Sequence, residues 1–187
     1  RWSEARPVAG KSVLLSSVGV VLTAVLTGLF CYFVLNMDFL EGMLIGSVLG
    51  STDAASVFSI LRSRKLNLKY GSASMLELES GSNDPFSYMM TIIVLTAMSG
   101  TMGVGQIAGM LASQLLFGLL VGAGVAFAAS RFLNRYQFYG EGFDTIFIFA
   151  VAIISYAFSS LIGGNGYLST YLTGIILGNQ TLKNQKT

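Results

Sequence analysis

An uncharged apolar run, SVLLSSVGVVLTAVLTGLFCYFVL, occupies residues 12–35 of this 187-residue chain. Its 24 residues exceed the roughly 20 that a helix needs to cross about 30 Å of hydrocarbon. Further apolar runs without Lys or Arg follow at residues 39–61, 72–98, 106–130, 145–162 and 167–182. The chain is therefore predicted to be an all-α membrane protein, a polytopic bundle of about six transmembrane helices, of which the last is short.

The overall composition supports a membrane protein and excludes several other classes. Apolar residues make up 53% and charged residues 11%, whereas roughly 25% of an average globular domain is charged. The chain has no histidine and a single cysteine, Cys31, which excludes a disulfide framework or a four-cysteine zinc site. No nucleophile–base pair or phosphate loop points to an enzyme, and we expect no cofactor. A net charge of +2 is too small to indicate nucleic-acid binding.

Basic residues are confined to four clusters, within residues 1–11, 62–69, 131–135 and 183–186. The intervening turns carry no Lys or Arg, so basic and non-basic connections alternate without interruption along the chain. Lys and Arg favour the cytoplasmic side of short loops. We therefore expect a multi-pass protein of the plasma membrane, with both ends of this segment in the cytoplasm.

Four carboxylates lie inside the predicted spans: Asp53, Glu77, Glu79 and Asp84. An ionisable group in lipid costs from about 2.5 kcal/mol upward, so such residues usually face a cavity and mark ion or proton pathways. The alternative is that one or two of them are structural and bind neighbouring helices. No Lys or Arg lies in any span to neutralise them.

The backbone near these carboxylates is predicted to depart from helix. Residues 50–55, GSTDAA, fall in the middle of the second span, and Gly, Ser, Thr and Asp favour a break at which Thr52 or Asp53 caps the second half. In the third span Pro85 cannot donate a backbone hydrogen bond and biases Asp84 away from helical geometry. We therefore expect discontinuous helices near Thr52–Asp53 and near Asn83–Asp84.

Such a site would bind cations and protons at the same oxygens. Desolvation favours the protonated form of a carboxylate, and a bound cation favours its charged form, so the two ligands compete. Because Asn83 beside Asp84 is neutral, one carboxylate at this dipeptide changes charge in each cycle. We expect one-for-one, electroneutral exchange by a secondary transporter.

The motifs Ser51-Thr52-Asp53-Ala54-Ala55 and Glu79-Ser80-Gly81-Ser82-Asn83-Asp84-Pro85, with the later stretch YLSTYLTGIILGN at residues 167–179, resemble the Asn-Asp branch of NhaP-type cation:proton antiporters. The residues of these motifs are most similar to those of bacterial potassium/proton antiporters. The resemblance implies that residues 1–187 are an incomplete part of a single sodium/proton-antiporter-like transmembrane domain, and that K⁺ or Na⁺ and H⁺ are its substrates.

The same resemblance implies a role for each motif residue. Asp84 would bind the cation and the proton, with Asp53 as second acid, Thr52 and Ser80 as further oxygen ligands and Asn83 holding the helix break. Glu79 would support the fold by pairing with an arginine of a later helix, which is not found in this chain. The resemblance assigns no role to Glu77.

The residues are also compatible with two other functions, and they do not decide between a monomer and a homodimer. The carboxylates could belong to an ion channel, or be structural groups of a non-transporting membrane scaffold or sensor. A channel needs a continuous polar lining, whereas these acids gather at two sites in consecutive spans. Gly118 with Gly122, and Gly174 with Gly178, have the spacing that permits close helix contact, either inside the subunit or in a homodimer.

Overall fold

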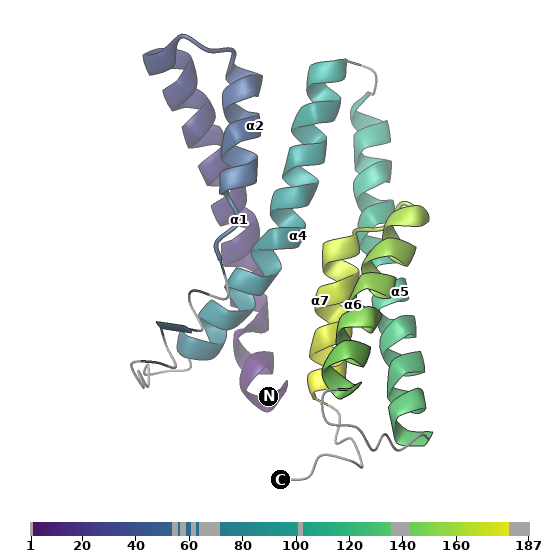
Figure 1. Cartoon of the computed structure of the whole chain (residues 1–187). Helices are drawn as coiled ribbons and strands as arrows, with labels where there is room; N and C mark the ends of the chain where they lie inside the picture. Colours follow the sequence, from purple (N-terminus) through teal and green to yellow (C-terminus); the bar gives the residue numbers. More distant parts are fainter. Residues whose placement is uncertain are drawn as a thin grey trace. The chain divides into compact units, whose positions relative to one another are not determined.

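The computed structural model describes residues 2–53, 72–100, 103–135 and 143–179, together with residues 56, 59, 60 and 63. Almost all of these residues are helical, and no strand occurs among them. The helices are α1 (Trp2–Leu35), α2 (Phe39–Leu49), α4 (Ser72–Ser99), α5 (Val104–Arg135), α6 (Phe143–Leu161) and α7 (Gly166–Gly178), shown in Figure 1. The predicted all-α class is confirmed.

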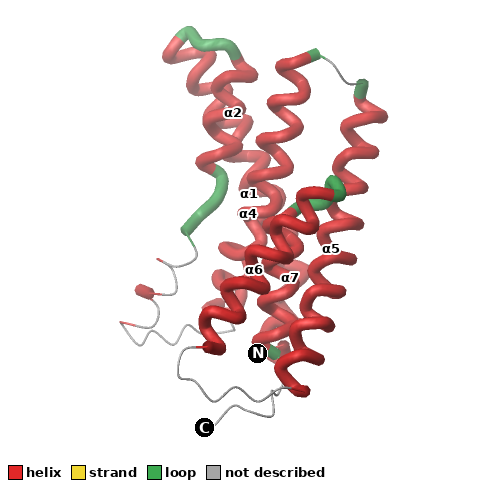
Figure 2. Tube along the Cα trace, turned by 45° about the vertical axis from the view of Figure 1, so that its right-hand side comes forward, coloured by secondary structure: helices red, strands yellow, loops and turns green. Residues whose placement is uncertain are grey.

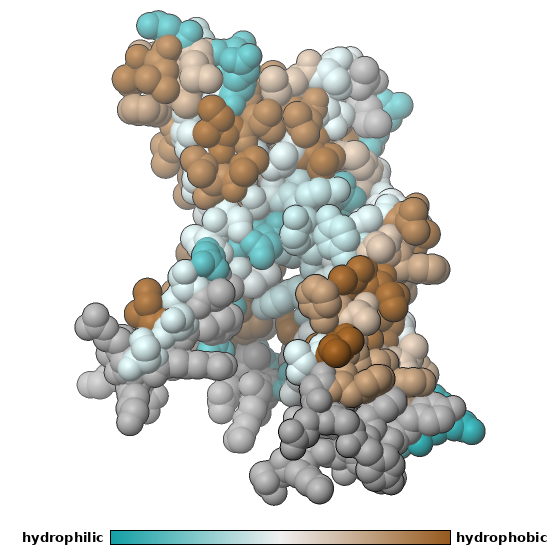
Figure 3. Space-filling model, viewed as in Figure 1, coloured by the Kyte–Doolittle hydropathy of each residue, from teal (hydrophilic) through white to brown (hydrophobic). Residues whose placement is uncertain are grey.

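Two of the described helices are long and apolar enough to cross a membrane, at Arg6–Leu35 and Val104–Arg135. The helical stretches Phe39–Leu49 and Thr145–Leu161 are also apolar but shorter. On the face drawn in Figure 3, apolar side chains cover much of the α1–α2 pair, and paler, more polar ones lie over the middle of α4. The exposed side chain of Phe33 is one of many apolar groups on α1 that suit contact with lipid.

The helices form two compact units, residues 1–107 and residues 108–187. In the first unit α1 packs against α2 and α4, and α2 packs against α4. Residues 36–38 connect α1 to α2, where Asn36 has a φ of 52° and the Asp38 side chain caps α2 by accepting the Leu40 amide at 2.8 Å. That the whole chain belongs to a single domain stays a prediction.

Small residues let α2 approach α1 closely. A Cβ atom added at Gly46 would lie 2.7 Å from the Cα atom of Ala24, and one added at Gly42 would lie 2.9 Å from the Cα atom of Gly28. Backbones at this separation leave no room for a side chain between them. The C-terminal end of α2 is therefore held against α1, facing α4.

The helix α4 is continuous from Ser72 to Ser99, with Pro85 inside it, so the predicted discontinuity near Asn83–Asp84 is wrong. In Figure 1 the α4 ribbon changes direction along its length but remains one helix. Pro85 lacks the N–H that would bond the Gly81 carbonyl, which costs one backbone hydrogen bond. Transmembrane helices tolerate this loss where Ser and Thr side chains and neighbouring helices satisfy polar groups nearby.

The second unit brings α5, α6 and α7 together through glycines and buried hydroxyls. A Cβ atom added at Gly118 would lie 3.0 Å from the Asn165 carbonyl oxygen, and one at Gly122 would lie 2.6 Å from that of Ser169. Asn165 caps α7 by accepting the Leu168 amide at 3.0 Å. The predicted glycine pair of α5 thus makes a close contact inside the subunit, while a Cβ atom at Gly174 or Gly178 would meet no described atom within 4 Å.

A hydroxyl network joins the three helices of this unit. The Ser155 hydroxyl lies 2.7 Å from that of Ser169 and 2.9 Å from that of Thr173, which also donates to the Gly122 carbonyl at 3.0 Å. All three side chains are buried. Ala129, Val151 and Leu177 form a small apolar core beside this network.

Candidate functional site

The helix α2 ends at Leu49, and residues 51–53 that follow are not helical (Figure 2). Gly50 still has helical dihedral angles and forms the C-cap. Glycine weakens a helix, and Ser, Thr and Asp compete for its backbone hydrogen bonds, so the chain leaves the helix at this point. The predicted break in the second span is confirmed here, whereas the capping of its second half falls outside the described residues.

Hydroxyl groups of α4 hold the end of α2 in place. The Ser87 hydroxyl donates to the Ser47 carbonyl, one of the last carbonyls of α2. The hydroxyls of Ser47 and Thr91 lie 3.1 Å apart, and Thr91 donates back to the Ser87 carbonyl at 2.8 Å. Polar groups at the helix end are thereby satisfied by a neighbouring helix, as a membrane interior requires.

Four of the predicted site residues come together where residues 51–53 meet α4. The Thr52 hydroxyl lies 2.9 Å from the Ser80 hydroxyl and accepts a hydrogen bond from the Asn83 side-chain amide. The Ser51 hydroxyl donates to the Asp84 carboxylate. We call Ser51, Thr52, Ser80, Asn83 and Asp84 the Asp84 cluster.

Burial within the Asp84 cluster differs from residue to residue. Ser80 and Asn83 are each 1% exposed, Asp84 is half-buried and Thr52 is exposed. The side-chain carbonyl oxygen of Asn83 is buried and has no hydrogen-bond partner in the described part of the chain. A buried oxygen of this kind is rare in native proteins and is a candidate ligand atom.

The remaining predicted acids are Asp53, Glu77 and Glu79. Asp53 is exposed, and its carboxylate accepts a hydrogen bond from the Ser56 hydroxyl. Glu77 and Glu79 are half-buried on α4. The pairing of Glu79 with an arginine of a later helix stays a prediction. Among the residues that the structure describes, no three acidic, histidine or cysteine side chains group closely enough to hold a metal ion by themselves.

Ser51 is the cluster member that sequence reasoning did not single out. It belongs to the same non-helical stretch as Thr52, and its hydroxyl is the group that reaches Asp84. The signal available was its place directly after the predicted end of the helix, where a serine side chain is free to bond a neighbouring element.

Comparison with known proteins adds evidence from the whole chain. The family model described as "Sodium/hydrogen exchanger, transmembrane" matches residues 1–187. The chain is 36% identical over 169 residues to a K(+)/H(+) antiporter NhaP2 of Shewanella oneidensis, a match that covers 89% of this chain and 29% of that protein. It is 36% identical over 183 residues to a K(+)/H(+) antiporter NhaP of Alkalimonas amylolytica, covering 95% of this chain and 31% of the relative.

A more distant relative carries the other cation in its name. The chain is 23% identical over 187 residues to a protein of Methanocaldococcus jannaschii named "Probable Na(+)/H(+) antiporter 2", with 95% of this chain and 43% of that protein covered. This chain therefore spans less than half the length of each of these three curated relatives.

Proposed function

Because the chain belongs to the sodium/hydrogen exchanger transmembrane family, we propose that it carries the ion-binding part of an antiporter that exchanges a monovalent cation for a proton. The description of the family as an exchanger supports a carrier, and not an enzyme, as the function of the chain. The names of its relatives support K⁺ and Na⁺ as the candidate cations.

The observation that carries the proposal is the set of oxygens around Asp84. The Asp84 carboxylate accepts a hydrogen bond from Ser51, and the hydroxyls of Thr52 and Ser80 lie in the same cluster. The side-chain carbonyl oxygen of Asn83 is buried there and has no hydrogen-bond partner among the described residues. Non-helical backbone beside a carboxylate is the arrangement with which secondary transporters bind alkali cations. Thr52 and Ser80 would complete the coordination, and Asp53 would act as second acid.

Competition at Asp84 couples the two fluxes. A cation at this carboxylate favours the charged form, and its departure lets a proton bind the same oxygens. Because Asn83 beside Asp84 is neutral, one carboxylate at this dipeptide changes charge in each cycle. This arrangement supports one-for-one, electroneutral exchange.

The test is proton movement in everted vesicles or proteoliposomes that contain the full-length protein, reported by a pH dye after addition of K⁺ or Na⁺. We expect the cation to release protons from vesicles with the wild type. We expect no proton release with Asp84→Asn, because the amide cannot exchange a proton for a cation. The cation that acts at the lower concentration identifies the preferred substrate.

Asp38→Asn is the matched control, since it makes the same chemical change at the N-cap of α2, where Asn serves as well as Asp. It should exchange as the wild type does. Continued exchange by Asp84→Asn would contradict the site. A cation current with the wild type would favour the ion channel, and no flux at all would favour the scaffold or sensor.

The location and orientation of the chain are proposed from its charge distribution. The alternation of basic and non-basic connections supports a multi-pass segment of the plasma membrane with both of its ends in the cytoplasm. A homodimer stays a prediction. Gly118 and Gly122 already contact α7 inside the subunit, so the small residues available for a dimer contact are Gly174 and Gly178.

A further inference from the structure

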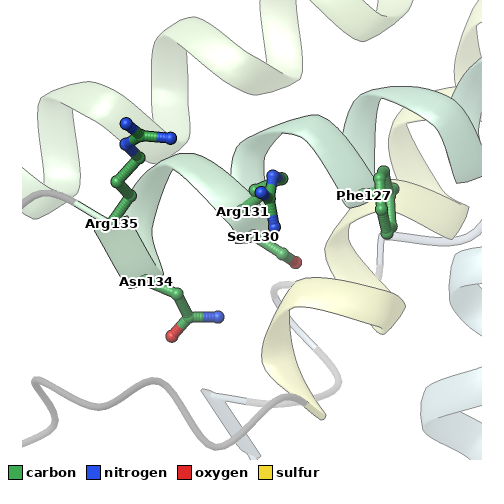
Figure 4. Close-up of a pocket in the computed structure, with 5 residues that line it drawn as sticks. All are labelled: Phe127, Ser130, Arg131, Asn134 and Arg135. Atoms are coloured by element: carbon green, nitrogen blue, oxygen red, sulfur yellow. The ribbon is translucent and has the colours of Figure 1, made fainter.

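The C-terminal part of α5 bears a pocket of about 500 Å³ that the Asp84 cluster does not use. It is lined by Phe127, Ser130, Arg131, Asn134 and Arg135, which follow one another along the helix in Figure 4. Phe127, Arg131 and Arg135 are spaced by four residues and share one stripe, with Ser130 and Asn134 on the next. The pocket therefore has an apolar end and a basic end.

From the length and charge of α5 we infer that its basic end lies at a membrane surface. The helix has 32 residues, which at 1.5 Å per residue make it roughly 48 Å long, whereas a bilayer's hydrocarbon is about 30 Å thick. Its uncharged stretch, residues 104–130, ends directly before Arg131. Phe127 thus lies at the edge of the apolar stretch, and the two arginines lie one and two turns beyond it, at headgroup depth.

Three polar side chains of this pocket can form further hydrogen bonds. Arg131 and Arg135 are exposed, and neither guanidinium has an ion pair or hydrogen bond within the described part of the chain. Ser130 is only 5% exposed, and its buried hydroxyl has no hydrogen-bond partner among the described residues. A buried hydroxyl without a partner is costly unless a ligand satisfies it.

A structural role accounts for only part of this arrangement. Arg135 lies in the last turn of α5, where a positive charge offsets the negative end of the helix dipole. The preference of basic residues for the cytoplasmic side accounts for the charge of both arginines. Neither role accounts for the buried Ser130 hydroxyl, which has no partner among the described residues, or for the adjoining apolar surface. Together with the two arginines they match an amphipathic ligand that bears a negative charge.

We propose that this pocket binds the phosphate group of an anionic phospholipid. Guanidinium groups pair with phosphate oxygens through two parallel hydrogen bonds, and Ser130 and Asn134 supply further polar contacts. The exposed ring of Phe127 lies where the acyl chains of such a lipid begin. Free inorganic phosphate offers the same group without the chains, so the test separates these two sources.

The experiment measures lipid binding to the purified full-length protein in neutral detergent by native mass spectrometry. Phosphatidylglycerol is titrated against phosphatidylcholine of the same chains and against inorganic phosphate. Loss of two basic contacts worth about 1 kcal/mol each predicts about thirtyfold weaker binding of phosphatidylglycerol to Arg131→Gln/Arg135→Gln. Arg131→Lys/Arg135→Lys, which keeps the charge but loses the two-point geometry, should fall between this variant and the wild type.

The matched control is Arg6→Gln/Lys11→Gln, which removes the same charge from exposed positions of α1. It should bind phosphatidylglycerol as the wild type does. Equal losses in both double variants, or equal binding of the two lipids to the wild type, would overturn the proposal. Arginine-dependent binding of inorganic phosphate as tight as that of the lipid would support the phosphate site and identify the free anion as its source.

If the double variant fails to fold, Arg135→Gln and Ser130→Ala provide smaller changes at the same pocket. Each should weaken phosphatidylglycerol binding, and unchanged binding in both would overturn the proposal. Because the measurement reports lipid binding and not ion exchange, its outcome is independent of the function proposed for the Asp84 cluster.

Discussion

At the scale of single residues, the Thr52 hydroxyl connects the non-helical segment to two buried groups of α4. It lies 2.9 Å from the Ser80 hydroxyl and accepts a hydrogen bond from Asn83. Ser80 and Asn83 are each 1% exposed, so water does not readily replace a lost partner. Removing this hydroxyl therefore leaves buried polar groups unsatisfied, which costs more than the hydrogen bond itself contributes.

We expect Thr52→Val to lower the free energy of unfolding by about 1–3 kcal/mol, because valine has the shape of threonine without its hydroxyl. The measurement is the thermal midpoint of the purified protein in detergent. Thr52→Ser keeps the hydroxyl and should stay close to the wild type. Equal midpoints for the Val and Ser variants would show that the hydroxyl contacts do not stabilise the protein.

Sequence reasoning identified Asp84 because a carboxylate inside an apolar run is unusual wherever the chain folds. It assigned Thr52, Ser80 and Asn83 to the same site through the resemblance to NhaP-type antiporters. It did not assign Ser51, whose hydroxyl bonds a carboxylate 33 residues further along the chain. That contact depends on how the end of α2 lies against α4, which local patterns do not contain.

At the scale of helices, two neighbouring glycines of α5, Gly122 and Gly124, have different surroundings. A Cβ atom at Gly122 would lie 2.6 Å from the Ser169 carbonyl oxygen, a backbone atom that cannot swing aside. A Cβ atom at Gly124, two residues later on α5, would have no described atom within 4 Å. The contact between α5 and α7 therefore depends on Gly122 in particular.

We expect Gly122→Ala to destabilise the protein by about 1–3 kcal/mol, because the added methyl group forces α5 and α7 apart. Gly124→Ala should be neutral or stabilise by up to about 1 kcal/mol, since alanine is the better helix former. Thermal midpoints of the two purified variants, compared with the wild type, measure this difference. A midpoint for Gly122→Ala at or above that of Gly124→Ala would contradict the close contact.

The two predicted helix breaks had different outcomes for a physical reason. After Gly50 several residues in succession favour leaving the helix, and the chain does leave it at residues 51–53. At Pro85 a single backbone hydrogen bond is lost, and the helix continues to Ser99. Contacts of Ser80 with Thr52 and of Ser87 with Ser47 hold α4 on both sides of that point.

At the scale of the whole chain, the distribution of basic residues predicts how it crosses the membrane. Lys and Arg occur in every second connection between helices, which favours the cytoplasmic side of the membrane for all of the basic connections. Within the first unit, Figure 1 shows the α1–α2 connection and the C-terminal end of α4 at the same end of the helices. Neither of these connections carries Lys or Arg, as the charge pattern requires.

We expect a cysteine in place of Ser63, between the basic residues 62 and 64, to react from the cytoplasmic side only, and one in place of Ser99 from the opposite side only. Each cysteine is introduced into protein in which Cys31→Ser has removed the native cysteine. A membrane-impermeant maleimide is then applied to intact cells and to inverted vesicles. Protein with Cys31 alone should label poorly, because this thiol is buried. Labelling of both introduced cysteines from one side would contradict the alternation.

The helical membrane class, the approximate positions of the helices, the break after Gly50 and the carboxylates inside the apolar runs can all be predicted from the sequence. Each of them depends on residues close together in the sequence, through hydropathy, charge or helix propensity. Folding alone brings the Ser51 hydroxyl to Asp84, keeps α4 helical through Pro85 and uses Gly118 and Gly122 as the contact with α7. These features depend on which helix surfaces pack together, and packing joins residues that are dozens of positions apart.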